Sequence, residues 1–167
     1  MDCEAVGPCP SLGRLTWFGA VDFDTDDAFN GLIVRCRPSK ENPAVPDPME
    51  EVSWDDYAQR SHKVFTLFAE WLSTRGAPRP SSNRPVMVSD NPAFDWQWIN
   101  DGFWRATGGN PFGHSARRIG DFYAGLTDNF RNTQRWKRLR VTPHDHDPVN
   151  DARGNCEAFR RMLLGER

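Results

Sequence analysis

The clearest pattern along the chain is an apolar stripe near its C-terminus. After Pro148, apolar residues recur at alternating spacings of three and four, which is typical of one face of a helix. They are Val149, Ala152, Cys156, Phe159 and Leu163. Asp147 is a good N-cap, and Pro148 suits the first helical position, where its missing N–H costs nothing. The pattern predicts a helix with Asp151 beside its apolar stripe and His146 on the entering loop.

A second segment repeats this arrangement upstream. Residues 86–88 form a short apolar run with β-branched side chains, which predicts a buried strand. Asn91 then serves as a cap, Pro92 takes the first helical position, and Asp95 follows four residues after the cap, as Asp151 does in the later helix. Near a helix N-terminus the dipole favours an ionised carboxylate, which is what a hard divalent cation needs. Aspartate is also simply common in first turns, so both readings stay open.

The chain begins with two acidic residues on one predicted strand face. Asp2 and Glu4 are two residues apart, and the period-two geometry of a strand points both side chains to the same side. Two neighbouring acids on a strand face repel each other unless a cation or a partner compensates them. Gly7 and Pro8 then end the strand. An exposed N-terminus with two solvated acids is the other reading.

The middle of the chain predicts further strands and a long helix. Strand candidates at 15–23 and 29–36 enclose a polar turn and predict an antiparallel hairpin. A loop with four prolines follows at 38–48. A helix then starts at the cap Ser53 and closes at Gly76.

The helix after Asp95 is rich in aromatic residues. Ile99 and Phe103 share a face with Asp95 and are expected in the core. The same helix carries three tryptophans, for which packing is favoured over base stacking: Trp96, Trp98 and Trp104. Residues 118–121 predict a short strand or turn before another helix. A hairpin sheet and parallel strands linked through helices together predict a three-layer mixed α/β fold in a single domain, residues 1–167.

Taken together, these segments resemble the DEDDh 3′–5′ exonucleases, a family that includes RNase T, oligoribonuclease and the proofreading subunits of DNA polymerases. The resemblance covers nearly the whole chain and is greatest to a bacterial and phage RNase T-like exoribonuclease branch. Its motifs are Asp-x-Glu-Ala-x-Gly-Pro, Phe-Gly-Ala-Val, Ser-Asp-Asn-x-x-Phe-Asp-Trp, Arg-Arg-Ile-Gly-Asp and His-x4-Asp. In this chain they stand at 2–8, 18–21, 89–96, 117–121 and 146–151.

The resemblance implies an RNase H-like fold, in which helices flank a mixed central sheet. It also implies two Mg²⁺ or Mn²⁺ ions held by Asp2, Glu4, Asp95 and Asp151. His146 would be the general base for the attacking water. The implied function is a 3′–5′ exoribonuclease that releases nucleoside 5′-monophosphates from single-stranded 3′ ends. RNA is favoured over DNA only by the branch that the chain resembles.

Two other functions stay open at this point, a 3′–5′ DNA exonuclease and a non-catalytic nucleic-acid-binding domain with a degraded metal site. The first strand raises the second alternative, because relatives place several apolar residues before the first aspartate and here only Met1 precedes Asp2. We expect this strand to be truncated or its start misassigned, which would position Asp2 and Glu4 poorly. A homodimer is inferred from relatives alone.

The distribution of charge suggests where a polyanion would lie. The formal net charge is only −2, but basic residues gather between positions 117 and 140. They are Arg117, Arg118, Arg131, Arg135, Lys137, Arg138 and Arg140. Of these, Arg117, Arg118, Arg135, Lys137 and Arg138 are the candidates for nucleic-acid contact, since phosphate neutralisation supplies most sequence-independent affinity. A solvated helix face is the alternative.

The four cysteines show no paired spacing, so we expect reduced thiols in a cytoplasmic protein rather than disulfides. A zinc site built from His144, His146 and a cysteine is conceivable but not favoured. His144 lies outside the His-x4-Asp spacing, and its replacement should matter far less than that of His146. No apolar run approaches the roughly 20 residues of a membrane helix, and no secretory signal is visible.

Overall fold

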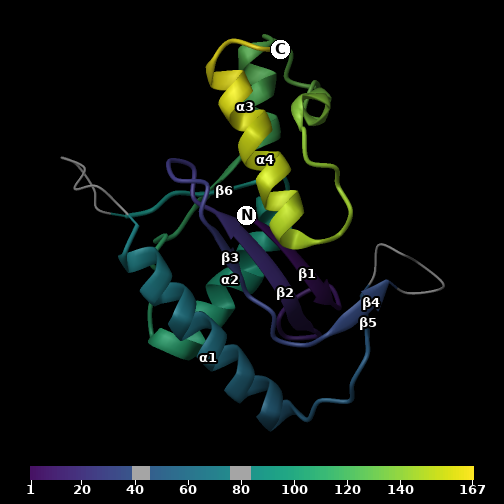
Figure 1. Cartoon of the computed structure of the whole chain (residues 1–167), viewed down its shortest axis with the longest axis vertical. Coiled ribbons are helices and arrows are strands. Elements are labelled where there is room, and N and C mark those ends of the chain that lie inside the picture. The colour runs from purple at the N-terminus through teal and green to yellow at the C-terminus, as the bar shows by residue number, and fades with distance from the viewer. Residues whose placement is uncertain (39–45, 76–83) are drawn as a thin grey trace.

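The computed structural model describes residues 1–38, 46–75 and 84–167 and combines helices with small sheets (Figure 1). The predicted mixed α/β class is therefore confirmed. The strands are β1 (Asp2–Val6), β2 (Arg14–Val21), β3 (Ala28–Asn30), β4 (Cys36–Pro38), β5 (Pro46–Pro48), β6 (Met87–Ser89) and β7 (Ala116–Arg118). The α-helices are α1 (Trp54–Ser73), α2 (Pro92–Thr107), α3 (Ile119–Leu126) and α4 (Pro148–Leu163), and a 3₁₀ helix, η1, spans Arg135–Leu139.

Strand pairing divides the described strands into three ladders. β1, β2 and β3 form an antiparallel sheet in that order, β4 pairs with β5 antiparallel, and β6 pairs with β7 parallel. The sequence predicted one central sheet, whereas β1 and β6 are joined here by a single hydrogen bond, from the Met1 ammonium to the Val88 carbonyl at 2.8 Å. β1 shifts register between Glu4 and Ala5, a local irregularity beside the acidic residues.

Helices cover both faces of the β1–β2–β3 sheet. Phe18 of β2 points to one face, where its ring stacks at 5.3 Å from the ring of Phe65 on α1. The next residue, Gly19, points to the opposite face, because side chains alternate along a strand. There a Cβ on Gly19 would lie only 2.1 Å from the Pro148 carbonyl oxygen at the start of α4. The sheet is thus enclosed between α1 on one side and α4 on the other.

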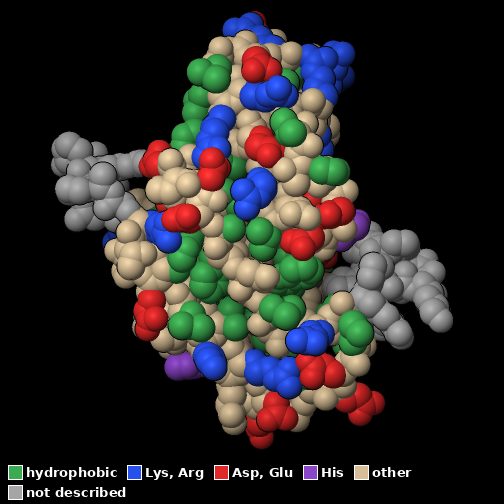
Figure 2. All heavy atoms as spheres, in the orientation of Figure 1, with side chains coloured by type: hydrophobic (Ala, Val, Ile, Leu, Met, Phe, Trp, Pro, Cys, Tyr) green, Lys and Arg blue, Asp and Glu red, His purple; other side chains and the backbone are tan. Residues whose placement is uncertain are grey.

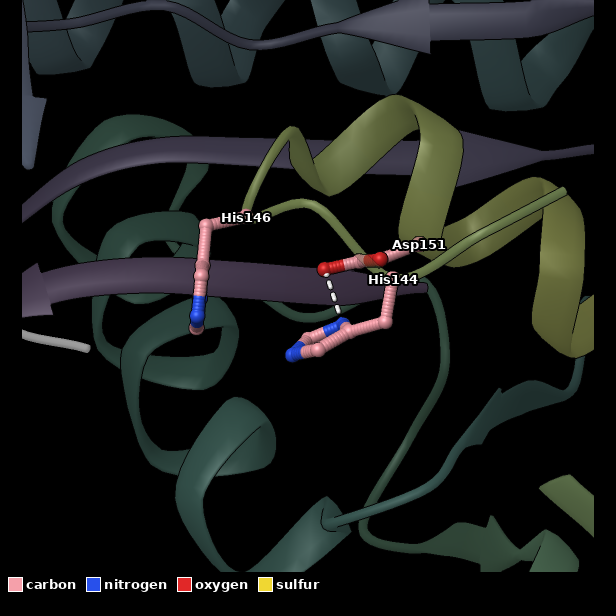
Figure 3. Close-up of side chains that lie close together, drawn as sticks. All are labelled: His144, His146 and Asp151. Atoms are coloured by element: carbon pink, nitrogen blue, oxygen red, sulfur yellow. Dashed lines mark ion pairs between the residues drawn. The ribbon is translucent and has the colours of Figure 1, made fainter. Parts of the chain in front are cut away.

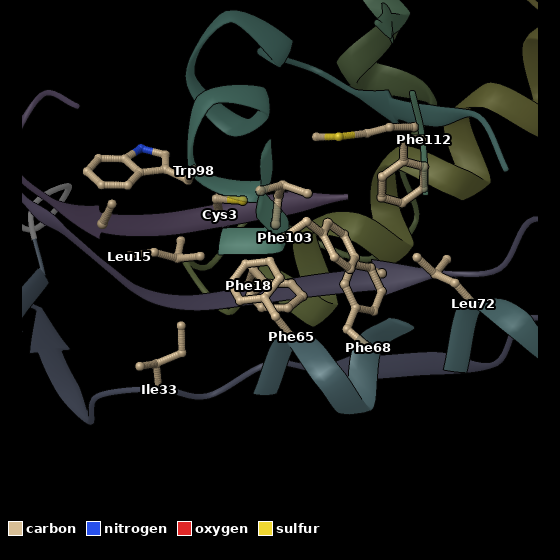
Figure 4. Packing of buried hydrophobic residues seen from close by; sticks show 14 of the residues in the cluster. Cys3, Leu15, Phe18, Ile33, Phe65, Phe68, Leu72, Trp98, Phe103 and Phe112 are labelled. Atoms are coloured by element: carbon tan, nitrogen blue, oxygen red, sulfur yellow. The ribbon is translucent and has the colours of Figure 1, made fainter. Parts of the chain in front are cut away.

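The larger hydrophobic core lies on the α1 side and is dominated by aromatic rings (Figure 4). Phe68 is fully buried at its centre, with ring centroids of Phe18, Phe29 and Phe103 between 4.7 and 5.4 Å away. α2 reaches this core through Gly102, where a Cβ would meet the Phe65 ring at 2.1 Å. Of the three tryptophans on α2, Trp98 is buried, as expected for packing, while Trp104 is half exposed.

The predicted starts of α1, α2 and α4 are confirmed, but the side chain of Asn91 makes no capping hydrogen bond. The Ser53 hydroxyl accepts a hydrogen bond from the Asp56 amide, which caps α1. Pro92 and Pro148 occupy the first positions of α2 and α4. The Asp147 carboxylate accepts bonds from the Val149 and Asn150 amides at 2.9 and 3.2 Å, the role expected of an N-cap.

The predicted buried face of α4 was wrong in part. Ala152 is buried, but Leu163 at the end of the predicted stripe is 54% exposed. The face turned into the protein also carries Asp151, Asn155, Ala158 and Met162. Hydrophobic periodicity could not predict this orientation, because two of these inward residues are polar.

Three boundaries differ from the sequence-based expectation. The strand predicted at 29–36 is limited to β3, and Gly31 follows, packed so closely that a Cβ would meet the Phe18 ring at 2.3 Å. The proline-rich loop at 38–48 is bordered by β4 and β5, and its central residues lie outside the described part of the chain. Gly76, expected to close α1, also lies outside it, whereas α1 ends at Ser73. Within the described ranges, no helix combines the length and apolar character needed to cross a bilayer.

Candidate metal centre

The four predicted ligands lie together on three different elements. β1 supplies Asp2 and Glu4, α2 supplies Asp95, and α4 supplies Asp151. Ligand oxygens of Asp2, Glu4 and Asp151 are within 4.8 Å of one another. The same limit holds for Asp2, Asp95 and Asp90, a residue that the sequence analysis did not select. We call these five carboxylates (Asp2, Glu4, Asp90, Asp95 and Asp151) the acid cluster.

The packing of α4 on β2 explains why the carboxylate of Asp151 lies in the acid cluster. Asp2 and Gly19 are register partners in the β1–β2 ladder, so the Asp2 side chain emerges beside Gly19 on the α4 face. Because Gly19 has no side chain, the first turn of α4 rests directly on β2 at Pro148. Asp151 lies one turn along α4 from the cap Asp147. The close helix–sheet contact therefore brings Asp151 against Asp2.

Asp95 is fixed by two neighbours in its surroundings. Its Oδ2 atom accepts a short hydrogen bond from the Ser89 hydroxyl at the end of β6. Its backbone carbonyl accepts one from the Cys3 thiol of β1, at a sulfur–oxygen distance of 3.9 Å. The Ser89 hydroxyl in turn accepts from the Asn91 amide at 3.0 Å, which holds the β6–α2 junction. Asp95 is 2% exposed and cannot avoid the other carboxylates by turning to solvent.

Burial and crowding make the carboxylates weaker acids than usual. Desolvation and then the charges of Asp95 and Asp151 raise the pKa of Asp2 well above its ordinary value. Desolvation raises the pKa of Asp95 to about 7, against the opposing hydrogen bond from Ser89. The pKa values of Glu4 and Asp151 are also raised by burial, and a neighbouring histidine offsets each. A cation at this position would relieve the repulsion and favour the ionised forms.

The donor set fits hard divalent cations. Its carboxylate oxygens are the ligands that Mg²⁺ and Mn²⁺ prefer. Oδ2 of Asp151 is fully buried and has no hydrogen-bond partner among the described residues. It lies 2.6 Å from Nδ1 of His144, an ion pair without hydrogen-bond geometry. Such an oxygen has a lone pair available for an ion.

Two histidines with partly exposed side chains, from the loop before α4, lie near Asp151, as Figure 3 shows. His146 Nδ1 lies 3.4 Å from Glu4 Oε1, and the two imidazole rings are 4.6 Å apart. His146 adopts a left-handed backbone conformation, with φ of 63°, directly before the cap of α4. His144 was expected to matter far less than His146. Its contact with Asp151, at 2.6 Å, is shorter than that of His146 with Glu4, so His144→Ala cannot serve as a control for His146→Ala. Together with Asp151 the two histidines form a further group of possible ligand atoms, which contains no cysteine. No disulfide joins any two of the cysteines, all of which the structure describes.

Asp90 has a different environment from the other members of the acid cluster. Its Oδ2 lies 3.1 Å from Lys137 Nζ and 3.7 Å from Arg140 Nη2. Lys137 belongs to η1 and Arg140 directly follows it, so both cations come from a segment distant from Asp90 along the chain. In the sequence, Asp90 stands directly before the cap Asn91 and within the motif at 89–96, but neither feature identified it as a neighbour of the predicted ligands.

Some of the residues predicted to contact nucleic acid already form ion pairs or hydrogen bonds with other residues of the protein. Lys137 pairs with Asp90, and Arg118 lies 3.2 Å from Asp121 and donates to the Asp90 carbonyl. Arg138 donates to the Arg167 backbone oxygen. Arg117 and Arg135 are exposed. On the face shown in Figure 2, basic and acidic side chains are interspersed, without a patch of one sign over α4.

Comparison with known proteins places this geometry in a functional context. No family model matches the chain. The chain is 29% identical, over 96% of its length and 88% of the relative's, to the 3′–5′ DNA exonuclease Cap18 of Escherichia coli. It is a distant homologue of a 3′–5′ exonuclease. The prediction of an enzyme is confirmed at this level. The RNase T-like branch is not confirmed, and the relative's name specifies DNA where the sequence analysis favoured RNA.

Proposed function

We propose that the protein is a metal-dependent 3′–5′ exonuclease that releases nucleoside 5′-monophosphates from single-stranded 3′ ends. The observation that carries the proposal is the convergence of four carboxylates: ligand oxygens of Asp2, Glu4 and Asp151 lie within 4.8 Å of one another, and Asp95 is equally close to Asp2. This convergence occurs in a chain homologous to an exonuclease over nearly its full length. The antiparallel β1–β2–β3 sheet beside the parallel β6–β7 pair supports an RNase H-like fold.

Asp2, Glu4, Asp95 and Asp151 would hold the two divalent ions. When bound, such ions activate water, hold the scissile phosphate and stabilise the leaving oxygen. The protein's own contribution is to keep these carboxylates within ligand distance in a buried site. Their burial also strengthens each interaction with a cation, since the local dielectric constant is low.

His146 is the residue that we assign to proton transfer. The contact of its Nδ1 with Glu4 favours the tautomer with the proton on that nitrogen, which leaves Nε2 able to accept one. Imidazole is the side chain that most often serves as a general base for an attacking water. His146 is 39% exposed, so solvent can carry the proton away.

We propose DNA as the substrate in preference to RNA. The support is the activity in the name of the relative, a DNA exonuclease, and it replaces the earlier expectation from the RNase T-like branch. Exonuclease chemistry at a 3′ end is the same for both polymers, so the acid cluster does not discriminate between them.

A non-catalytic nucleic-acid-binding domain is the second candidate. It is favoured by the internal ion pairs of the acid cluster, because Lys137 and Arg140 already face Asp90 and His144 faces Asp151. In that case the cluster would be neutralised from within and would not need metal ions.

The deciding experiment follows 5′-labelled single-stranded DNA and RNA of matched sequence with Mg²⁺ and with EDTA. We expect a ladder shortened from the 3′ end, nucleoside 5′-monophosphate as product, dependence on Mg²⁺ and faster loss of DNA. Asp95→Ala should abolish the ladder, whereas the matched control Asp121→Ala, an exposed carboxylate on α3, should leave it unchanged. Binding without Mg²⁺-dependent hydrolysis would establish the second candidate, and faster loss of RNA would overturn the choice of substrate.

A further inference from the structure

A buried arginine borders the acid cluster, and the proposed reaction gives it no part. Arg140 follows η1, and its side chain is 7% exposed. Its Nη2 donates a short hydrogen bond to Asn155 Oδ1 and lies 3.7 Å from Asp90 Oδ2. Its Nε is buried without a hydrogen-bond partner among the described residues. The guanidinium carbon lies 5.1 Å from the centre of the Trp136 ring.

Both polar neighbours of Arg140 lead directly to predicted ligands. Asp90 has a carboxylate oxygen within 4.8 Å of those of Asp2 and Asp95. Asn155 follows Asp151 by one turn of α4, and its Nδ2 donates to the carbonyl of Met1, the residue before Asp2, at 3.5 Å. Arg140 therefore connects α4, the start of β1 and the β6–α2 junction, which are the elements that carry the acid cluster.

The charge of Arg140 differs from that of the other cations nearby. The two histidines are charged only when protonated, and Lys137 is 44% exposed, where solvent screens it. A guanidinium keeps its charge at every physiological pH. Burying it is unfavourable unless negative charge compensates it. The carboxylate of Asp90 provides that compensation.

We propose that Arg140 is a positioning residue, a fixed internal cation that holds Asp90 and Asn155 and offsets the repulsion within the acid cluster. It keeps the carboxylates together when no metal ion is bound. The claim that Arg140 acts in place of metal ions rests on the proposed function. The claim that its charge offsets carboxylate repulsion does not, since it follows from the ion pair with Asp90 and the burial of Arg140.

The test compares thermal unfolding of the full chain in EDTA and in saturating MgCl₂. Arg140→Gln keeps a hydrogen-bonding side chain of similar length and removes the charge. Its melting temperature should fall in EDTA and recover partly with Mg²⁺, because the ions supply the missing positive charge. The Mg²⁺-induced rise should therefore exceed that of the wild type, while Arg140→Lys should give a rise close to the wild type. An equal loss in both buffers would mean that Arg140 only fills space, and would overturn the proposal.

Two further variants complete the comparison. Arg160→Gln removes a cation of α4 that pairs with Asp26 at 2.6 Å, away from the acid cluster, and should leave the Mg²⁺-induced rise unchanged. The double variant Asp90→Asn/Arg140→Gln removes one charge of each sign, so it should be more stable in EDTA than Arg140→Gln alone. If Arg140→Gln folds only with Mg²⁺, the proposal is supported. If the double variant is no more stable than the single one, it is wrong.

These readouts separate the proposal from the proposed function. If Mg²⁺ stabilises the proteins in the expected order but no DNA is hydrolysed, the exonuclease assignment fails and the role of Arg140 stands. If Mg²⁺ fails to stabilise even the wild type, the metal site is wrong, and the comparison of single and double variants in EDTA alone decides whether Arg140 acts through its charge.

Discussion

Without metal ions, the buried Asp95 should make the protein less stable as the pH rises. Its pKa is about 7 in the folded protein because burial disfavours the charged form, whereas in the unfolded chain it should be about 3.9. Between these values the unfolded chain has released the proton and the folded protein still holds it. Each pH unit then lowers the free energy of unfolding by about 1.4 kcal/mol. The contribution of Asp95 to the free energy of unfolding is fully present below about pH 4 and is lost above about pH 7. It amounts to at most about 4 kcal/mol.

Asp95→Asn isolates this effect, since the amide cannot ionise and can still accept the hydrogen bond from Ser89. In EDTA at pH 8 we expect the variant to be more stable than the wild type by up to about 4 kcal/mol. Near pH 4 the two should be similar. The assay is urea unfolding followed by circular dichroism at each pH unit from 4 to 8. Asp121→Asn, an exposed change on α3, serves as the control.

Added Mg²⁺ should reduce the difference in stability between Asp95→Asn and the wild type. Ions bound by the acid cluster favour the ionised carboxylate of the wild type and gain less from the amide, so the advantage of Asp95→Asn at pH 8 should shrink or disappear. The reasoning is refuted if wild type and variant keep the same difference in stability from pH 4 to pH 8 in EDTA. That result would mean that Asp95 titrates alike in the folded and unfolded chains.

Four further outcomes are expected. His146→Ala should lower the rate of mononucleotide release by roughly 10²- to 10⁴-fold with little change in the circular dichroism spectrum, and His144→Ala should act mainly by raising the Mg²⁺ concentration needed for half-maximal rate. Asp151→Ala should abolish hydrolysis of labelled DNA while the melting temperature in EDTA stays equal or rises, because a repelling carboxylate is gone; retained turnover would contradict its role as a ligand. Phe68→Ala, at the centre of the aromatic core, should reduce the free energy of unfolding in urea by about 3–5 kcal/mol.

The features that the sequence predicted well are those with local causes. The cap-and-proline pairs at Asn91-Pro92 and Asp147-Pro148 define helix starts through the backbone of a single turn, and both helices begin there. The alternation that puts Asp2 and Glu4 on one strand face is equally local. The spacing of each aspartate from its cap then fixes where its carboxylate emerges, which is why the predicted ligands meet.

The features that the sequence missed depend on contacts between distant segments. The inward face of α4 carries Asp151 and Asn155, because these side chains meet β1, and a count of apolar residues cannot register that preference. Asp90 joins the acid cluster through its position beside Asp2 and its ion pairs to Lys137 and Arg140. No spacing rule connects positions 90 and 140. The role of His144 was missed for a related reason, since the loop before α4 turns back toward Asp151.

Gly19 bears on how variants of this protein would be interpreted. It takes no part in any chemistry, yet it determines how far the first turn of α4 stands from β2, since even one methyl group would collide with the Pro148 carbonyl. A side chain at position 19 would push the first turn of α4 away from β2. Asp151 on α4 would then move away from Asp2, the register partner of Gly19. In a screen that reads only activity, such a change would be indistinguishable from the loss of a ligand. A residue without a reactive side chain can therefore be as sensitive to substitution as a metal ligand.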